Sequence, residues 1–425
     1  MIDRNSLPQI LENPPFISPS PDYYPLDNQS KLFFFPDPML DLIHVNVSIK
    51  AGSLFDTKKY IAIALFNFLK ESSPDYPLDK MDNFLDFYGA SWNTTVNLEN
   101  VIIEWIVPKS NCEIVLPILF NTLLYPRFDE NSFDNFKEQK IKDFEYNSRK
   151  FAYRATQLMF STLFTENSPL ATLLTPYYIN SLSISDLYDF HNFTVYSQRV
   201  KVFVCGNYND KIKNILISSL QKLSLSYAPI TFTSHCYTGA PKSIFEDREK
   251  PLQSSVIMCK NLFDYNDPDR RDFYFLSTLL GGYFGSRLMQ NLREKNGYTY
   301  GISNGISYYG NNSFYYIESD FAVEKTKSAV EACYDEMLNL QQTFVSEEEI
   351  DVVKRYIEGS LLRKSDGVIS FMKYFSFLEN FGNDENETVE MFNSINNISK
   401  EKIFTLANRY LKSNSFSLVV VGKYE

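Results

Sequence analysis

An arginine and a tyrosine in the second half of the chain have the types and spacing that most suggest chemistry. Arg293 follows the stretch Gly281-Gly282-Tyr283-Phe284-Gly285-Ser286-Arg287-Leu288, and it begins the stretch Arg293-Glu294-Lys295-Asn296-Gly297-Tyr298-Thr299-Tyr300-Gly301. The pattern predicts an apolar helix, a break at the glycines, a second helix through Arg293 and a strand that contains Tyr300. Two side chains placed in this way can converge, and both carry hydrogen-bond donors. In the alternative, Arg293 only caps its helix and Tyr300 packs in the core.

The chain offers little for other kinds of catalysis. It contains three histidines, His44, His191 and His235, and no two of them are close in sequence. Its five cysteines are dispersed without a Cys-x-x-Cys pair, which is typical of free thiols in a reducing compartment. The sequence has no Gly-x-Ser-x-Gly nucleophile motif and no phosphate-binding loop ending in Gly-Lys-Ser/Thr. It therefore argues against a self-contained hydrolase of another class.

The stretches around Arg293 and Tyr300 resemble the carboxyl-terminal signature of the pitrilysin-type (inverzincin) zinc peptidases, and in particular the bacterial processing-peptidase-like group. The resemblance is strong over residues 270–302, moderate over residues 48–146, and rests on pattern elsewhere. It implies that Arg293 and Tyr300 help to bind the substrate backbone and the reacting carbonyl, where donors stabilise a developing oxyanion. It also implies two homologous halves that enclose a cavity.

The same family carries its zinc on an inverted His-x-x-Glu-His helix, and the matching segment here spans residues 63–72. Laid on that motif, Asn67 and Glu71 occupy the two histidine positions, and Lys70 occupies the position of the catalytic glutamate. Glu145 matches the third ligand. An amide is a weak zinc ligand, and a lysine cation repels the metal. The resemblance therefore implies a degenerate zinc site, with no metal and no other cofactor in this chain.

Two interpretations of the degenerate positions stay open. In one, Lys70, Glu71 and Glu145 neutralise one another where the metal would otherwise sit. In the other, they are ordinary solvated charges on helix surfaces. Both interpretations predict that the chain alone is not a zinc peptidase.

Length and composition fit a soluble protein of two domains. A chain of 425 residues exceeds one ordinary domain, and its 44% hydrophobic and 22% charged residues are typical of globular proteins. The net charge of −11 argues against nucleic-acid binding, for which a basic face is usual. The apolar runs are too short to span a bilayer, and the start of the chain lacks a secretory signal pattern. The expected location is cytoplasmic.

The chain also repeats itself, which indicates an internal duplication. Each half ends in an apolar run closed by Gly-x-Tyr, at residues 206–208 and 422–424, and a serine that can cap a helix precedes each run, at Ser183 and Ser399. Paired strand patterns at residues 97–107 and 313–321 precede predicted helices around 111–124 and 324–342. Ser346 and Glu349 have the spacing of a capping box at the start of a further helix.

The predicted fold class is α+β, with two homologous halves that enclose a cavity. Each half is a mixed, mostly antiparallel sheet with helices packed on one face. The expected division is an N-terminal domain at residues 1–222 with the degenerate zinc motif, a linker at 223–241, and a C-terminal domain at 242–425 with the Arg/Tyr motif.

Three functional hypotheses follow. The first is a zinc-less subunit of a heterodimeric zinc metallopeptidase, which contributes Arg293 and Tyr300 to the active site of a zinc-bearing homologous subunit. Its partners are then that subunit and a peptide substrate, with no nucleic acid and no membrane span, and zinc is expected only in the partner. The second is a catalytically inactive peptide-binding or scaffold homologue, which could be a homodimer. The third, an active zinc endopeptidase, conflicts with the missing histidines.

Overall fold

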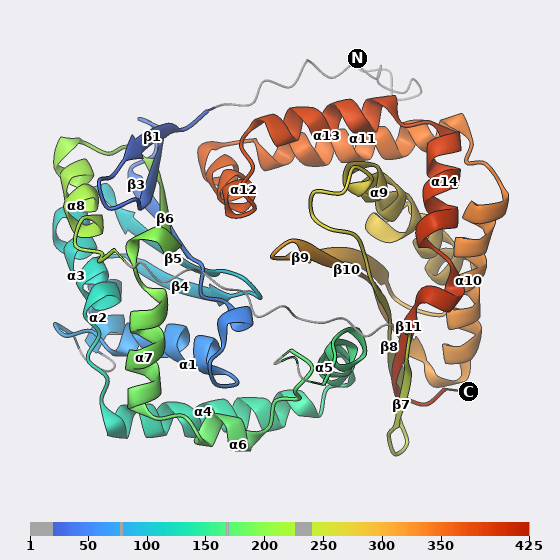
Figure 1. Cartoon of the computed structure of the whole chain (residues 1–425), viewed down its shortest axis with the longest axis horizontal. Coiled ribbons are helices and arrows are strands. Elements are labelled where there is room, and N and C mark those ends of the chain that lie inside the picture. The colour runs from blue at the N-terminus through green and yellow to red at the C-terminus, as the bar shows by residue number, and fades with distance from the viewer. Residues whose placement is uncertain (1–19, 77–79, 167, 169, 226–239, 425) are drawn as a thin grey trace, which may run out of the picture.

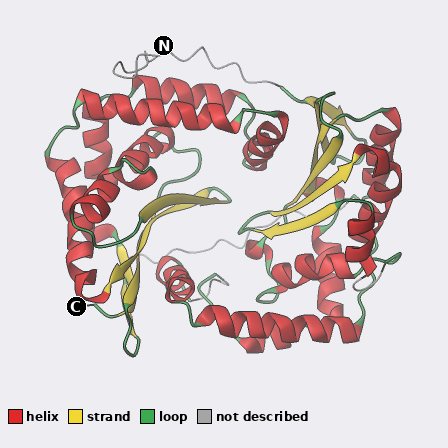
Figure 2. Ribbon diagram, turned by 180° about the vertical axis from the view of Figure 1, so that it is seen from behind, coloured by secondary structure: helices red, strands yellow, loops and turns green. Residues whose placement is uncertain are grey.

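The computed structural model describes residues 20–76, 80–166, 168, 170–225 and 240–424 of the chain. These residues form two β-sheets, one in each half, and helices surround both (Figure 1). Seen from behind, most of the helices lie on the outer sides of the two sheets (Figure 2). The predicted α+β class with two sheets is confirmed. Most of the expected linker lies outside the described residues.

The first half contains a six-stranded sheet and the helices of the degenerate motif. The sheet has the order β1-β2-β6-β3-β5-β4. The strands are β1 (Asp22–Pro25), β2 (Lys31–Pro36), β3 (Leu42–Ile49), β4 (Ser91–Val96), β5 (Val101–Pro108) and β6 (Val200–Gly206). The helices are α1 (Ile61–Phe68), α2 (Lys80–Phe87), α3 (Cys112–Leu124), α4 (Glu130–Ser148), α5 (Phe151–Leu163), α6 (Pro176–Asn180), α7 (Ile184–Thr194) and α8 (Asp210–Leu220).

The second half contains a five-stranded sheet of order β7-β11-β8-β10-β9. Its strands are β7 (Ser243–Asp247), β8 (Gln253–Asn261), β9 (Ile302–Tyr309), β10 (Asn312–Ala322) and β11 (Ser417–Gly422). Its helices are α9 (Arg270–Ser277), α10 (Thr326–Gln342), α11 (Glu347–Lys364), α12 (Val368–Asn380), α13 (Asn386–Asn397) and α14 (Lys400–Tyr410). Two π-helical turns follow α9, namely η5 (Thr278–Gly282) and η6 (Met289–Lys295).

The two sheets have the same strand order and the same directions. In each, the last strand of the half pairs in parallel with an early strand, β6 with β2 and β11 with β7. On the other side the last strand pairs antiparallel, and two further antiparallel pairs complete the sheet. Strand β1 is an addition at the edge of the first sheet. This agreement is what the sequence repeat predicts, while an origin by duplication stays an interpretation.

The two repeated glycines show why the repeat extends to single residues. Gly206 and Gly422 end β6 and β11 with φ values of 128° and 136°. A Cβ at Gly206 would lie 2.0 Å from the carbonyl oxygen of Leu42, and one at Gly422 would lie 2.5 Å from Oγ of Ser254. Positive φ and close backbone approach both require glycine here.

Serines cap the helices that the sequence marked. Oγ of Ser183 accepts from the backbone N–H of Asp186 in a full capping box, and Oγ of Ser399 accepts from Lys402. Of the predicted capping box at Ser346 and Glu349, the serine half is present, since Oγ of Ser346 accepts from the backbone N–H of Glu349, whereas the carboxylate of Glu349 pairs with Arg287. These contacts satisfy N–H groups that the first helical turn leaves without partners.

Each half contains one helix that packs against the sheet of the other half. Alternating side chains of each sheet face opposite sides, so one face of the first sheet packs on its own helices. The other face receives α12 from the second half, where Phe371, Met372 and Phe375 pack against Phe33 and Phe203. Helix α5 from the first half packs in return on β8 and β11 of the second sheet. The expected cover on one face is therefore supplemented on the opposite face by an exchanged helix (Figure 1).

Within the described part of the chain, no helix is long and apolar enough to cross a bilayer. The described cysteines, Cys112, Cys205, Cys259 and Cys333, are free and buried, as predicted, and Cys236 lies outside the described residues. Burial raises the pKa of the Cys205 and Cys259 thiols to about 12, so these groups pack as apolar side chains.

The α12 seam, where Phe371, Met372 and Phe375 of α12 pack on Phe33 and Phe203 of the first sheet, gives a first testable prediction. Phe375 is 3% exposed, and its ring centroid lies 5.3 Å from that of Phe33. We expect Phe375→Ala to lower the free energy of unfolding by about 3–5 kcal/mol, because it removes a buried ring and leaves a cavity. Phe377→Ala, on the same helix but with Phe377 48% exposed, is the control, with an expected change below about 1 kcal/mol. Urea unfolding measures the free energy of unfolding of both variants. Equal losses in the two variants would mean that α12 does not anchor the two halves.

Candidate functional site

The predicted helix, break and second helix around the glycines are present. Helix α9 and η5 bury Phe273, Leu276 and Leu280, which belong to the expected apolar face. The break follows at residues 283–286, and a helical segment then continues through η6. At Gly281 an added Cβ would lie 2.9 Å from the side chain of Asn304, so this glycine permits close packing of the break against β9.

Arg287 ties this break to the neighbouring helix α11. Its Nε and Nη2 donate to the two carboxylate oxygens of Glu349 at 2.8 and 2.7 Å. Glu349 is thus held by a two-point contact with Arg287 at the N-terminus of α11, where a carboxylate is also favoured by the helix dipole. This contact fixes the start of the segment that carries Arg293.

Arg293 lies within η6, and the helix ends without help from its side chain. The backbone N–H of Gly297 donates to the carbonyl of Arg293, and that of Tyr298 to the carbonyl of Leu292, with Gly297 at a φ of 62°. This is a glycine-terminated helix end. The Arg293 guanidinium lies 4.6 Å from the ring centre of Phe284, and its Nη1 lies 3.5 Å from Glu294. The alternative in which Arg293 caps the helix is therefore wrong.

Tyr300 lies in a loop, not in the predicted strand, because β9 begins at Ile302. Its side chain is 90% exposed, which also excludes the core-packing alternative. The loop itself is held on both sides of Tyr300. Gly301 N–H donates to Oγ1 of Thr299 at 3.1 Å, and Oγ of Ser319 on β10 lies within hydrogen-bond distance of Oγ1 of Thr299 and of the Gly301 carbonyl oxygen, at 2.9 and 2.8 Å. A restrained backbone thus presents an unburied phenol.

The degenerate zinc helix has a different shape from a regular helix. Helix α1 ends at Phe68, and a 3-10 turn covers Leu69–Glu71. In a regular α-helix, residues 67 and 71 would be roughly 40° apart around the axis, whereas the 3-10 turn separates them by roughly 100°. Nδ2 of Asn67 donates to the carbonyl of Ile63 at 2.9 Å. By this geometry, the two positions that match the family's histidines do not share one helix face.

The start of α1 is fixed by a buried carboxylate. Asp56 accepts from the backbone N–H groups of Tyr60 and Ala62, both at 3.0 Å. Tyr60 adopts a φ of 78°, a strained value for a residue other than glycine. Burial raises the pKa of Asp56 to about 7, although the backbone donors oppose this shift. The contact positions the start of α1 through its backbone.

The charges of the degenerate motif find other partners. Nζ of Lys70 lies 2.6 Å from Oδ1 of Asp82 on α2, a residue outside the motif, so Lys70 does not form the ion pair with Glu71 or Glu145 that one of the two interpretations proposed. Glu145 is exposed on α4. Burial raises the pKa of Glu71, while the nearby Lys70 lowers it. In the described residues no cluster of three or more His, Cys, Asp or Glu side chains could hold a metal. The residues at these positions therefore do not fit zinc.

Each of the two described histidines contacts a neighbouring element of the fold through a ring nitrogen. Nε2 of His44 lies 3.2 Å from Oε1 of Glu104 on the neighbouring strand, and Nε2 of His191 lies 2.8 Å from the carbonyl of Leu123. Burial lowers the pKa of His191. Both histidines are buried, and His235 lies outside the described residues.

The structure contains a cavity between the two halves, and the residues that line it were not predicted from the sequence. Its volume is about 840 Å³, and it is lined by residues from β3 to β5, α9, β9 and α11 to α13. None of Asn67, Lys70, Glu71, Arg293 and Tyr300 lines it. Most of its lining residues belong to no motif, so sequence spacing offered no signal for them.

The raised pKa of Glu71 gives a prediction with a defined sign. A carboxyl whose folded pKa exceeds its unfolded pKa contributes stability below the unfolded pKa and loses it as pH rises through the folded pKa. We therefore expect Glu71→Gln to raise the melting temperature relative to the wild type at about pH 7 and to lose this gain at about pH 4. Glu145→Gln, on exposed α4, controls for the loss of one negative charge. The melting temperatures are measured by thermal unfolding followed by circular dichroism. A gain in the melting temperature of Glu71→Gln that is the same at both pH values contradicts the prediction.

Comparison with known proteins identifies two adjoining regions of one family. The model described as "Insulinase (Peptidase family M16)" matches residues 37–176, and the model described as "Peptidase M16 inactive domain" matches residues 181–357. The uncharacterized zinc protease YmxG of Bacillus subtilis is 22% identical over 419 residues, which cover 94% of this chain and 97% of that protein. The non-peptidase homolog YmxG of Helicobacter pylori is 21% identical and covers 93% of each chain.

A solved structure shows the same fold. The peptidase M16 inactive domain from Pseudomonas fluorescens superposes with a TM-score of 0.85 and 17% identity, and the match covers 95% of this chain and 98% of that one. Family models extend from residue 37 to residue 357, and the likeness in fold extends over nearly the entire chain. The chain therefore belongs to the M16 peptidase family, the insulinase and pitrilysin type.

Proposed function

We propose that this chain is a zinc-less subunit of a heterodimeric zinc metallopeptidase and that it contributes Arg293 and Tyr300 to the active site of its partner. The observation that carries the proposal is the side chain of Tyr300, which is 90% exposed on a loop that hydrogen bonds hold in place. A free tyrosine on a restrained loop is suited to act on a molecule outside this chain.

The surroundings of Arg293 support the same role. Its guanidinium lies against Phe284, whose side chain is 62% exposed, while the side chain of Arg293 is 36% exposed. Stacking restricts the guanidinium without neutralising its charge. Arginine and aromatic residues are also the types that most often dominate the affinity of protein interfaces. Phe284, Arg293 and Tyr300 thus have the chemistry of a contact surface with two oriented donors.

The degenerate motif explains why the chemistry needs a second chain. Asn67, Lys70 and Glu71 supply neither a zinc ligand set nor a carboxylate at the position of the family's catalytic base, and Lys70 pairs with Asp82 on α2. A water molecule cannot be activated here by the route that the family's intact motif uses. Among the relatives, one is named a non-peptidase homolog, and the matched second domain is described as inactive. The cytoplasmic location stays a prediction.

The partner is tested first. We expect the tagged chain, purified gently from its native cells, to bring with it a homologous subunit that carries an intact His-x-x-Glu-His helix. The reconstituted pair should cleave peptides, whereas each subunit alone should not. Recovery of only a second copy of this chain, with no peptidase activity, would favour the inactive scaffold hypothesis over the heterodimer.

The Arg/Tyr contribution is tested in that complex. We expect Arg293→Ala and Tyr300→Phe each to reduce kcat by about a hundredfold or more, because each removes a donor aimed at the oxyanion. Assembly, followed by size-exclusion chromatography, should be retained. Tyr177→Phe is the matched control, because Tyr177 is 74% exposed on α6 of the other half. Full activity in an assembled Arg293→Ala or Tyr300→Phe complex would show that the pair only shapes the surface.

The metal content of the chain alone is a separate prediction. We expect the purified chain to hold far less than one zinc per molecule after dialysis, because the amide of Asn67 and the cation of Lys70 replace donors that zinc prefers. Plasma mass spectrometry measures the zinc, with the partner subunit as the positive control. One zinc per chain that survives dialysis would contradict the prediction.

A further inference from the structure

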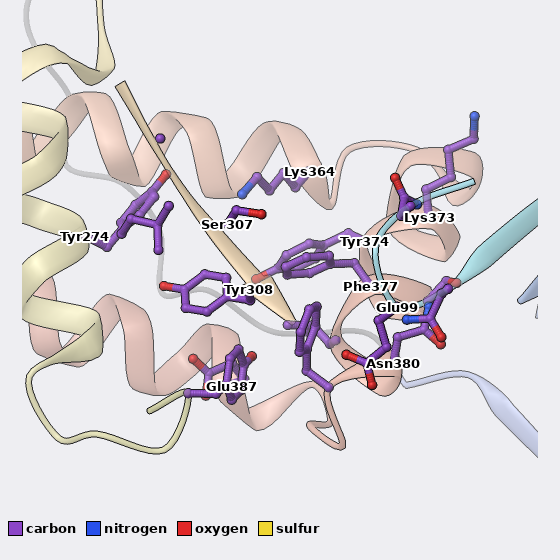
Figure 3. A pocket seen from close by; sticks show the side chains of 18 of the residues that line it. Glu99, Tyr274, Ser307, Tyr308, Lys364, Lys373, Tyr374, Phe377, Asn380 and Glu387 are labelled. Carbon is purple, nitrogen blue, oxygen red and sulfur yellow. The ribbon is translucent and has the colours of Figure 1, made fainter. Parts of the chain in front are cut away.

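The cavity between the two halves is lined by side chains from several elements, and the proposed function gives these side chains no role. The hairpin between β4 and β5 and strand β9 form two of its walls, and α9, α11, α12 and α13 form the others. Figure 3 shows side chains from several of these elements pointing into one space, including Tyr274, Tyr308, Lys364, Tyr374 and Phe377. Its volume of about 840 Å³ lies within the range of about 300–1,000 Å³ that is usual for ligand sites.

Two carboxylates in the lining are already neutralised by this chain. Glu104 accepts from Nζ of Lys373 at 2.7 Å and from His44 at 3.2 Å, and the His44 contact is the largest of several that lower the pKa of Glu104 to about 2. Glu99 lies 2.9 Å from Nζ of Lys50. Lys373 and Lys50 are therefore committed to these carboxylates, and neither is the natural partner of an anionic ligand.

The third carboxylate of the lining, Glu387, is neutralised as well. It pairs with Arg270 at 2.5 Å and with Arg271 at 2.7 Å. Arg271 also contacts Glu390. This group lies on the opposite side of Tyr308 from Lys364 (Figure 3). The arginine charges are thus matched within the protein.

Lys364 differs from every other cation in the lining. It is the last residue of α11, and in the described part of the chain no carboxylate lies within ion-pair distance of its Nζ. Its described neighbour is the ring of Tyr374, with 5.3 Å from Nζ to the ring centre. The side chain of Lys364 is exposed to the solvent in the cavity. The surrounding protein nevertheless shields its amino group from part of the bulk water, and this desolvation lowers its pKa. Its amino group points toward the space between Tyr274, Ser307 and Tyr374 (Figure 3).

The rest of the lining can hold apolar groups and amides. Tyr265 and Phe381 stack with ring centroids 4.8 Å apart, and Tyr308 lies 5.1 Å from Tyr265. Phe377 adds a ring that is 48% exposed. Side-chain amides also line the cavity, at Asn46, Asn97, Asn100, Asn304 and Asn380. Rings of this kind bury apolar side chains, and amides can pair with peptide groups.

We propose that this cavity binds a peptide segment that carries a carboxylate, with the carboxylate paired to Lys364 and a neighbouring apolar side chain against Phe377. The carboxylate can come from a glutamate or aspartate side chain or from the carboxyl terminus of the peptide. A small organic acid with an apolar group shares this chemistry, so the experiment compares both sources. The cavity lies within one chain and contains neither Arg293 nor Tyr300, so it does not depend on a partner subunit.

The test is calorimetry on the purified full chain, with probes that differ only in charge. The peptide acetyl-Ala-Phe-Glu-Phe-Ala-amide should bind at least about tenfold more tightly than the same peptide with glutamine, because a hydrogen bond to a charged group adds about that factor. The glutamine peptide with a free carboxyl terminus and 3-phenylpropionate are the other two probes. Tighter binding of either identifies the source of the carboxylate. Binding of 3-phenylpropionate with no binding of any peptide overturns the peptide part of the proposal.

Two variants locate the carboxylate contact. Lys364→Met should abolish the preference for glutamate over glutamine, while Arg363→Met should retain it. Both remove a cation from the last turn of α11, so both change the helix terminus alike, but Arg363 does not line the cavity. Because no carboxylate among the described residues lies within ion-pair distance of Lys364, Lys364→Met and Arg363→Met should change the melting temperature by similar, small amounts. Equal affinity of the wild type for the two peptides, or a preference that survives Lys364→Met, overturns the proposal.

Discussion

The exchange of one helix between the two halves is the contact on which the rest of the structure depends. Helix α12 covers the inner face of the first sheet, and α5 covers the corresponding face of the second. Without α12, the rings of Phe33, Phe35 and Phe203 would face water, at a cost of about 25 cal/mol for each Å² of apolar surface. Neither half can bury its own sheet completely. The relative position of the halves is therefore a result of core packing.

The same helix also creates the cavity. One side of α12 carries Phe371 and Phe375 to the first sheet, and the other side carries Tyr374 and Phe377 to the cavity. Both seams carry charge. Glu379 on α12 pairs with Lys31 and Lys201 at 2.5 and 3.2 Å, and Arg154 on α5 pairs with Glu246 on β7 at 2.8 Å. Burial lowers the pKa of Lys201, so Glu379 stabilises a lysine that the seam partly removes from water.

The sequence predicted those features whose cause is local. Gly206 and Gly422 mark strand ends because the backbone there needs positive φ, and Ser183 and Ser399 cap helices by contacts within one turn. The exchanged helices could not be predicted, because an amphipathic pattern shows that a helix buries one face but not which sheet receives it. The loop at Tyr300 depends on Ser319, a residue of another strand. The partner of Lys70 on α2 and the lining of the cavity likewise follow from tertiary packing.

The 3-10 turn at the end of α1 bears on whether this segment could hold a metal. In a regular helix, two imidazoles at positions 67 and 71 would lie on one face. Here Leu69–Glu71 form a 3-10 turn, while Asp56 and the strained Tyr60 hold the other end of the helix in place. A metal site on this helix would therefore require a change in main-chain geometry as well as in residue identity.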